Sequence, residues 1–229
     1  MWQIETFDPD TIVSEGHMKT PKDIVKEGYD KVSFAYRGDE LEESDESYQQ
    51  YKAWAEEITV HLKQGSSVLD LGCGCGLPTT KLLARKYKVT GVDISPVQIS
   101  RARMLVPDAK FICDDMCEVS FDKEQFDAVV SLYAIIHVPV EEQPQLLSRV
   151  WQWLKPGGFF LLTAGQTEWT GMEENWLGVD GGHMFWSHAD RETYLQWFGT
   201  ANFTILWDRF IPEANGGHIL MLATKDEKS

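Results

Sequence analysis

The feature that most constrains the fold is the segment VLDLGCGCGLPTTK, residues 68–81. An apolar run ends in a carboxylate, Asp70, and glycines follow at alternate positions, Gly72, Gly74 and Gly76. Glycines let the backbone approach a ligand closely, as in the strand-to-helix loops of nucleotide-binding folds. Two interpretations compete: a loop that cradles the phosphates of a dinucleotide, or a loop shaped for another nucleoside ligand.

Strand-like and helix-like segments alternate after the start of this segment. The sequence predicts strands at residues 68–71, 88–93, 111–113, 126–132 and 159–164, and helices at 78–87, 96–105 and 141–154. Strict alternation is typical of βαβ units, so we expect a parallel sheet with helices on both faces. Two later strand-like runs, 203–210 and 218–223, are joined by a connection too short for a crossover helix, which predicts an antiparallel pair.

The N-terminal part has a different organisation. Residues 1–20 resemble a loosely held arm, and apolar residues at helical spacing predict helices over 21–36 and from about 48 to 62. We expect one single domain, in which residues 1–64 form this N-terminal region and residues 65–229 form the core. An aromatic-rich loop is inserted in the core at 165–190.

Composition limits the partners of the chain. Its 229 residues carry a formal net charge of -15 and no basic stripe, which disfavours nucleic acid as a partner. No apolar run approaches the roughly 20 residues of a membrane span. The acidic start resembles neither a signal nor a transit peptide, so we expect a cytoplasmic protein. Cys73, Cys75, Cys113 and Cys117 fit no usual zinc spacing; we expect reduced thiols and no metal.

The dinucleotide interpretation fails at its defining position. The third glycine of that motif belongs five residues after Gly72, where the chain has Leu77. Instead, Asp93 and Asp115 follow the ends of the next two predicted strands. The carboxyl ends of parallel strands meet at one edge of the sheet, so these acids and Asp70 converge on one crevice. Such a crevice suits a cationic nucleoside better than a pyrophosphate.

The ordered motifs make a resemblance specific. VLDLGCGCG, VTGVDIS, FICDDMCEVSF, FDAVVSLYAIIHVP and WLKPGGFFLLT span residues 68–163 in this order. In order and spacing they resemble the motifs of class I S-adenosylmethionine-dependent methyltransferases. The resemblance implies a Rossmann-like seven-stranded, mostly parallel sheet with helices on both faces and an antiparallel C-terminal strand pair. It also implies S-adenosyl-L-methionine as methyl donor and S-adenosyl-L-homocysteine as product.

The same resemblance implies a set of donor-binding residues. Gly72 and Gly74 would approach the donor's amino acid end, with Asp70 orienting the loop, and Asp93 would hold the ribose hydroxyls. Asp115 would take the adenine amino group, with Asp114 as a rival, although strand-end acids can also be merely solvated. The full predicted set is Tyr29, Tyr36, Asp70, Gly72, Cys73, Gly74, Asp93, Ile94, Asp115, Met116 and Leu132. Tyr29 and Tyr36 lie on one face of a helix that resembles the family's lid.

Catalytic groups are harder to assign, because methyl transfer mostly needs positioning and sometimes removal of a proton. His137 follows the fourth motif and is a candidate general base; the alternative is a histidine that fixes the loop by a backbone hydrogen bond. Tyr133 is a candidate acid or base, or a pocket wall. The chain lacks an Asn-Pro-Pro-aromatic motif and an acidic ligand cluster near this segment, which disfavours adenine, glutamine and metal-dependent catechol methylation.

The inserted loop is the expected acceptor site. It is longer than ordinary α/β connections and rich in large apolar side chains, which favours a binding wall or, alternatively, a small satellite core. The predicted substrate-binding residues are Trp169, Trp176, Met184, Phe185 and Trp186, with Met172 nearby. His183 and His188 are secondary base candidates.

These expectations converge on a methyltransferase that acts through an O, N or S atom of a small, partly apolar molecule, as a monomer or homodimer. Two alternatives stay open. The first is a protein or RNA methyltransferase that receives its substrate through a partner. The second is a non-catalytic nucleoside-binding protein, because a fold does not guarantee an activity.

Overall fold

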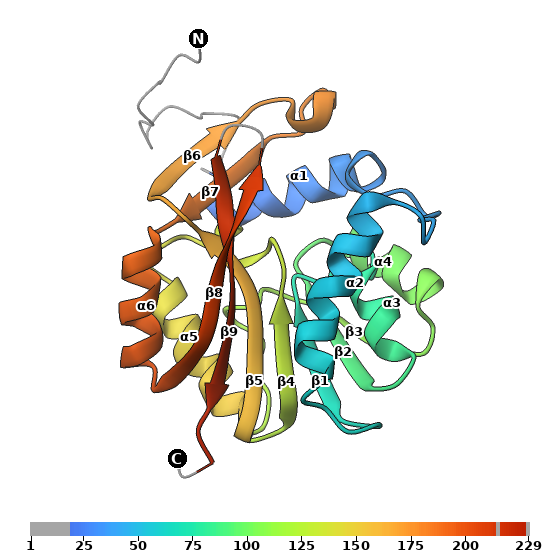
Figure 1. Ribbon diagram of the computed structural model, residues 1–229. Helices are drawn as coiled ribbons and strands as arrows, with labels where there is room; N and C mark the ends of the chain where they lie inside the picture. Colours follow the sequence, from blue (N-terminus) through green and yellow to red (C-terminus); the bar gives the residue numbers. More distant parts are fainter. Residues whose placement is uncertain (1–18, 214–215, 228–229) are drawn as a thin grey trace.

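A computed structural model describes residues 19–213 and 216–227 of the chain (Figure 1). The arm predicted at residues 1–20 therefore lies almost entirely outside the described residues. The main sheet has seven strands in the order β3-β2-β1-β4-β5-β9-β8. Their bounds are β1 Ser67–Leu71, β2 Lys88–Asp93, β3 Lys110–Cys113, β4 Phe126–Ser131, β5 Leu154–Gly165, β8 Phe203–Glu213 and β9 Gly216–Lys225. Pairing is parallel from β3 to β5 and antiparallel from β5 to β8, which confirms the predicted fold class.

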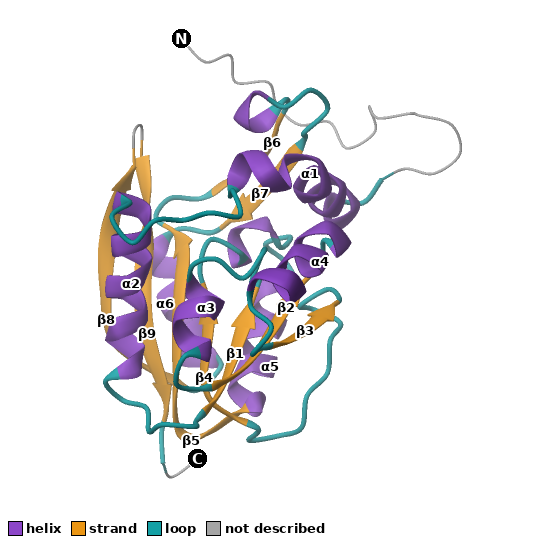
Figure 2. Cartoon of the chain, turned by 90° about the vertical axis from the view of Figure 1, so that its right-hand side faces the viewer, coloured by secondary structure: helices purple, strands orange, loops and turns teal. Residues whose placement is uncertain are grey.

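Helices cover both faces of this sheet. They are α1 Pro21–Tyr36, α2 Glu46–Thr59, α3 Thr79–Ala84, α4 Pro96–Leu105, α5 Gln143–Trp153 and α6 Arg191–Thr200. Side chains of α5 and α6 belong to one buried cluster with the sheet, and side chains of α2 and α3 belong to another. Figure 2 shows α2 and α3 in front of the sheet and α1 above the ends of its strands.

Local sequence signals explain where two of these helices begin. Thr20 caps α1: its hydroxyl accepts from the backbone N–H of Asp23, whose carboxylate in turn accepts from the backbone of Thr20. Ser95 caps α4 by accepting from the backbone N–H of Gln98 at 3.0 Å. In both helices proline follows the cap, where its missing N–H removes no helical hydrogen bond.

The structure corrects some predicted boundaries. The helix predicted at residues 78–87 is only the short α3, and β5 begins at Leu154, so the predicted KPGG turn lies within the strand. The inserted segment 165–190 is more ordered than a loop. It contains β6 Trp169–Glu173 and β7 Met184–His188, which pair antiparallel in a second sheet, and the short 3-10 helix η2 Trp176–Gly178.

This second sheet packs on α1 and forms a cap with it over the main sheet (Figure 1). Ile24 and Val25 of α1 pack with Met184 and Phe185 of β7 in one buried cluster. The approach is close at Gly28, where a Cβ atom would lie 2.1 Å from the carbonyl oxygen of His183. A side chain at that position would therefore push the helix and the strand apart.

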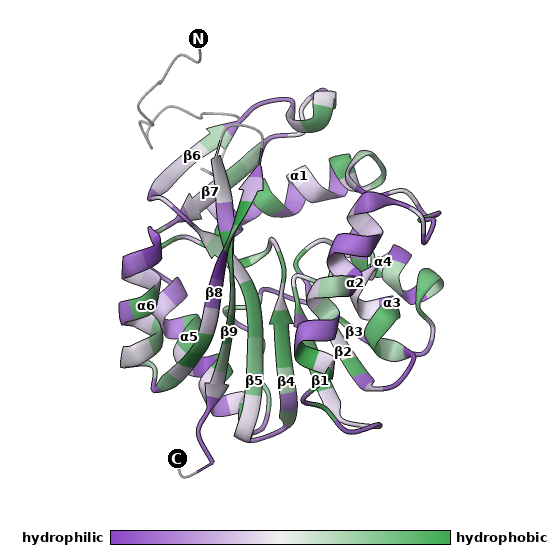
Figure 3. Cartoon of the chain, viewed as in Figure 1, coloured by the Kyte–Doolittle hydropathy of each residue, from purple (hydrophilic) through white to green (hydrophobic). Residues whose placement is uncertain are grey.

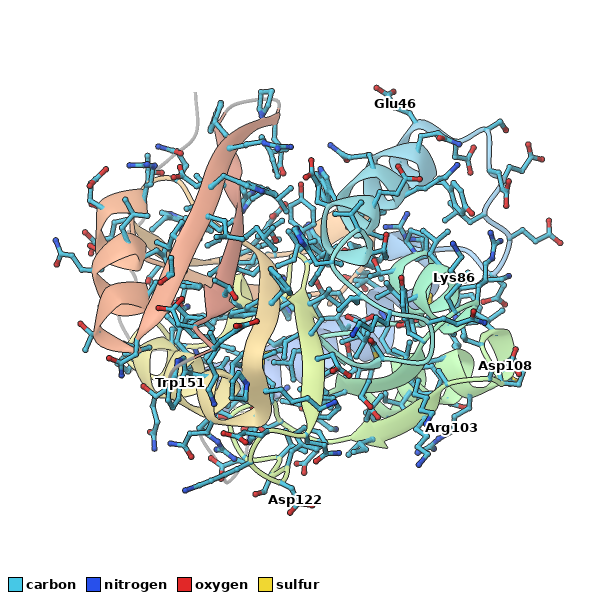
Figure 4. The ribbon with its side chains drawn as sticks, turned by 60° about the horizontal axis from the view of Figure 1, so that its bottom comes forward. Glu46, Lys86, Arg103, Asp108, Asp122 and Trp151 are labelled. Carbon is cyan, nitrogen blue, oxygen red and sulfur yellow. The ribbon has the colours of Figure 1, made fainter. Side chains whose placement is uncertain are left out.

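The interior is apolar and the charges lie outside. In Figure 3 the central strands are mostly hydrophobic, and hydrophilic residues gather on the outward sides of the helices and in the connections. The exposed side chains of Glu46, Lys86, Arg103, Asp108 and Asp122 project from the rim in Figure 4. Within the described ranges, no helix has the length and apolarity that crossing a membrane requires. All four cysteines are free thiols.

Candidate functional site

The largest candidate site is a cavity between α1 and the carboxyl ends of the central strands. Its empty volume is about 660 Å³, within the range typical of small-molecule sites. We call it the strand-end cavity. Its walls come from α1, the glycine segment, the ends of β2 to β4 and the segment after β4: Lys22, Val25, Tyr29, Tyr36, Gly72, Gly74, Val92, Asp93, Ile94, Asp114, Asp115, Met116, Leu132, Tyr133, Ala134, His137 and Val138.

Asp93 organises the floor of this cavity. One carboxylate oxygen accepts from the backbone N–H of Gly74 at 2.8 Å, and the other accepts from that of Ser95 at 2.9 Å. Burial raises the pKa of Asp93 to about 6, although these two hydrogen bonds oppose the rise. Gly72 has φ of +75°, and a Cβ atom there would lie 2.1 Å from the Cβ of Ala134. The backbone passes so close to the segment after β4 that only glycine fits.

Asp70 has a different role from Asp93. Its side chain is buried and does not line the strand-end cavity; the Thr80 hydroxyl donates to it at 2.5 Å. Burial raises the pKa of Asp70 to about 7, and the hydrogen bond from Thr80 opposes this rise. Because Thr80 belongs to α3, the contact joins the end of β1 to the helix that follows the glycines. The geometry matches the expectation that Asp70 orients the loop.

Asp114 and Asp115 both line the cavity at the end of β3, and their contacts differ. Asp115 accepts from the backbone N–H of Cys117 at 2.8 Å and pairs with the ammonium of Lys22 at 2.7 Å. Lys22 also pairs with Glu142. Partial burial disfavours the charged lysine, but the hydrogen bonds from Asp115 and Glu142 outweigh it and raise the pKa of Lys22. These ion pairs tie α1 to the rim of the cavity.

A smaller cavity continues beyond the glycines, and we call it the glycine-side cavity. It is lined by Tyr36, Arg37, Tyr51, Asp70, Gly72, Cys73, Gly74, Cys75, Leu77, Thr79 and Leu132. Arg37 is its cation: the guanidinium lies 5.6 Å from the ring centre of Tyr36 and 5.3 Å from that of Tyr51. Its Nε is buried and has no hydrogen-bond partner among residues 19–213 and 216–227. Sequence reasoning missed Arg37, although it directly follows Tyr36.

His137 is held from both sides at the top of the strand-end cavity. Its Nδ1 lies 2.8 Å from the carbonyl oxygen of Phe185, and its Nε2 lies 2.9 Å from the Tyr29 hydroxyl. A carbonyl only accepts, so Nδ1 donates and Nε2 accepts from Tyr29. Burial lowers the pKa of His137 to about 4, although the bond to Phe185 opposes this. Trp186 covers the ring at 4.3 Å between centres. The contacts match the expected loop-fixing histidine.

A third cavity adjoins the first two and is walled by aromatic rings. This aromatic chamber is lined by Tyr29, Tyr36, Arg37, Gln50, Tyr51, Tyr133, His137, Trp176, Trp186, Glu213 and His218. It shares Tyr29, Tyr36, Tyr133 and His137 with the strand-end cavity. It shares Tyr36, Arg37 and Tyr51 with the glycine-side cavity. Tyr36 therefore stands where the three cavities meet.

Tyr133 stands at the boundary between the strand-end cavity and the aromatic chamber. Its φ of +54° is rare for a non-glycine residue, and its backbone N–H donates to the hydroxyl of Thr163. The phenol donates to Glu213 at 2.6 Å. Burial raises the pKa of Tyr133, and the bond to the carboxylate raises it further. Sequence reasoning missed Glu213 and His218, because both come from the C-terminal hairpin.

The residues predicted from the inserted segment divide into two groups. Trp176 and Trp186 line the aromatic chamber. Met184 and Phe185 are buried against α1, and Trp169 is 46% exposed beside His188, so these three line none of the three cavities. Nδ1 of His188 donates to the carbonyl of Thr167 at 2.7 Å, and His183 is exposed. Met184 and Phe185 thus match the satellite core weighed from the sequence.

Comparisons with known proteins agree with the fold and the site. Residues 68–158 match the family model described as a methyltransferase domain. A 2-methyl-6-phytyl-1,4-hydroquinone methyltransferase of Synechocystis is 39% identical over 106 residues, which cover 44% of this chain and 32% of that protein. A 24-methylenesterol C-methyltransferase of Arabidopsis thaliana is 33% identical over 116 residues, which cover 46% and 32%. The chain thus spans about a third of the length of these two relatives.

Solved structures extend the likeness over nearly the whole chain. A magnesium protoporphyrin IX methyltransferase from Synechocystis, crystallised with bound SAM, superposes with a TM-score of 0.70 at 16% identity, covering 93% of this chain and 100% of that one. A [4+2]-cyclase superposes with a TM-score of 0.69 at 18% identity, covering 90% and 96%. The fold and the crevice define an α/β protein of the nucleoside-binding kind. More narrowly, the chain carries a class I S-adenosylmethionine-dependent methyltransferase domain.

Proposed function

We propose that the chain transfers a methyl group from S-adenosyl-L-methionine to an O, N or S atom of a small, partly apolar molecule. The observation that carries this proposal is the junction of the cavities. The strand-end and glycine-side cavities offer the groups that a nucleoside with an amino acid tail requires, and the aromatic chamber opens onto both through Tyr36.

The residues present fit the donor. Asp93 accepts the ribose hydroxyls, and Asp115 accepts the adenine amino group between Ile94 and Met116. At the other end, the clash that a Cβ at Gly72 would meet shows how closely the backbone can follow the tail. The buried, unpartnered Nε of Arg37 supplies a cation for the carboxylate of that tail. Leu132 lines both donor cavities and marks the turn between them.

When bound, the donor supplies an activated methyl group on a sulfonium. The chain's own residues then position the acceptor in the aromatic chamber for in-line displacement and exclude water from the reacting atoms. His137 holds the lid helix and β7 in place, since both of its ring nitrogens are engaged. Tyr133 forms a wall of the chamber and keeps its proton on the phenol, which donates to Glu213.

Small size of the acceptor is supported by the chamber and by the relatives. The chamber is enclosed by side chains of this one chain, and the relatives are named for a hydroquinone and a sterol. A monomer or homodimer in the cytoplasm is part of the proposal. The [4+2]-cyclase among the structural neighbours favours one second candidate, a protein that keeps the donor pocket without transferring a methyl group.

The proposal is tested by incubating the purified chain with methyl-labelled S-adenosyl-L-methionine and a small-molecule extract, followed by mass spectrometry. We expect label in a small product and formation of S-adenosyl-L-homocysteine in equal amount. Label found only in protein or RNA would contradict the small-molecule proposal. Binding of the donor without any labelled product from extracts, protein or RNA would support the non-catalytic candidate instead.

A further inference from the structure

The charges that line the aromatic chamber are unevenly placed, and this inference rests on the proposed function. Its lining contains two residues with permanent formal charges, Arg37 and Glu213. Arg37 also lines the glycine-side cavity, where the donor's carboxylate would neutralise it. Glu213 lines neither donor cavity. Once the donor is bound, the chamber therefore presents an uncompensated negative charge to the acceptor.

Glu213 is arranged to receive a ligand. Its Oε1 takes both contacts with the chamber: the Tyr133 hydroxyl at 2.6 Å and Nδ1 of His218 at 3.1 Å. Within residues 19–213 and 216–227, no side chain or backbone N–H bonds to Oε2. The contact with His218 lowers the pKa of Glu213, burial opposes this, and the bond from Tyr133 adds to it. The carboxyl is therefore ionised at neutral pH.

Aromatic rings surround the space in front of this carboxylate. Trp176 lies 5.5 Å from Trp186 in an edge-on arrangement, and Tyr36 lies 5.5 Å from Trp176. Tyr51 and Tyr133 complete the wall at 6.2 Å from each other. The faces of tryptophan and tyrosine attract cations, and the attraction is strongest where water is excluded. A carboxylate among such rings is complementary to an ammonium group that carries apolar substituents.

We propose that the methyl acceptor is a small amine, which enters the aromatic chamber as its ammonium form and is held by Glu213 and the surrounding rings. Its apolar part would lie along Trp176 and Trp186. A neutral alcohol or thiol gains nothing from the unpaired carboxylate. A carboxylic acid would be repelled by it.

The transfer step requires the amine to lose a proton first, because an ammonium nitrogen has no free electron pair. The Glu213–His218 pair is the base in contact with the acceptor: with Nδ1–H directed at Glu213, Nε2 of the neutral ring carries the lone pair. The amine nitrogen then forms a bond to the methyl carbon as the carbon–sulfur bond breaks, and both electrons of that bond stay on sulfur. The accepted proton leaves to solvent through Glu213, whose side chain is 40% exposed.

The binding test uses the full chain saturated with S-adenosyl-L-homocysteine and two probes of nearly equal shape, phenethylamine and phenethyl alcohol, followed by calorimetry at neutral pH. We expect the amine to bind at least about tenfold more tightly than the alcohol. Glu213→Gln should weaken the amine about tenfold and leave the alcohol within about twofold. Glu192→Gln, which removes an equally negative side chain from the exposed surface of α6, should change neither.

Equal affinities, no measurable binding of the amine, or a preference that survives in Glu213→Gln would overturn the inference. The labelled product gives an independent reading, since nuclear magnetic resonance identifies the atom that carries the new methyl group. A methyl group on nitrogen supports the inference. A methyl group on oxygen or sulfur would overturn it and leave the proposed function standing, whereas failure of the chain to bind S-adenosyl-L-homocysteine would defeat the proposed function itself.

Discussion

The Tyr29 hydroxyl lies 2.9 Å from Nε2 of His137, and this contact joins the lid helix α1 to the segment after β4. On its other side His137 donates to Phe185 of β7. One buried imidazole thus connects three segments that are far apart in sequence. Because both nitrogens are occupied, its geometry is that of a structural connector between the donor site and the aromatic chamber.

Tyr29→Phe tests this connection. The substitution keeps the ring but leaves Nε2 of a buried histidine without its donor, which should lower the free energy of unfolding by about 1–3 kcal/mol in urea denaturation. Tyr48→Phe is the matched control, since its hydroxyl donates to Glu43, a side chain that is 68% exposed. The control should lose less than about 0.5 kcal/mol. Equal losses in the two variants would contradict the assigned contact.

The pKa of His137 predicts an acid-sensitive stability. The folded pKa of about 4 lies below the ordinary value of 6.5, so the unfolded chain takes up this proton first as the pH falls. The stabilising contribution is present above pH 6.5 and is lost between about 6.5 and 4; its full size is roughly 3 kcal/mol. Chemical denaturation at several pH values should show a smaller loss in His137→Gln than in the wild type. Parallel curves would refute this assignment.

Asp93 predicts a pH dependence of donor binding with the same direction. Its pKa is raised to about 6 in the folded chain, and the ionised form accepts hydroxyl protons. The affinity for S-adenosyl-L-homocysteine should therefore fall as the pH drops through about 6, as measured by calorimetry. Asp93→Asn should weaken binding at neutral pH by about ten- to a hundredfold and flatten this dependence. An unchanged affinity in the variant would remove Asp93 from the donor site.

Arg37 provides a test that separates the two ends of the donor. Arg37→Met should reduce the affinity for S-adenosyl-L-homocysteine by about tenfold or more, because the amino acid carboxylate loses its charged partner. The affinity for methylthioadenosine, which lacks that end, should stay within about twofold of wild type. Equal weakening of both ligands would indicate a general disturbance of the lid instead of a lost contact at the glycine-side cavity.

The chain's periodic segments made the sheet predictable, and the ends of its strands made Asp93 and Asp115 predictable. What sequence reasoning missed depends on distant pairing. Glu213 and His218 reach the chamber only because the C-terminal hairpin pairs beside β5. The partner of His137, Phe185, comes from a segment read as a loop, and that segment becomes a strand by pairing with β6. Burial of Met184 and Phe185 follows from α1 lying on that sheet, which no local pattern revealed.

The central claim is that the crevice at the strand ends binds S-adenosyl-L-methionine, and calorimetry on the purified chain tests it most directly. S-adenosyl-L-homocysteine and NADH are titrated separately into the same preparation. The account predicts one molecule of S-adenosyl-L-homocysteine bound per chain and no binding of NADH, since Leu77 occupies the third glycine position of the dinucleotide motif. Saturable binding of NADH, with none of S-adenosyl-L-homocysteine, would contradict it.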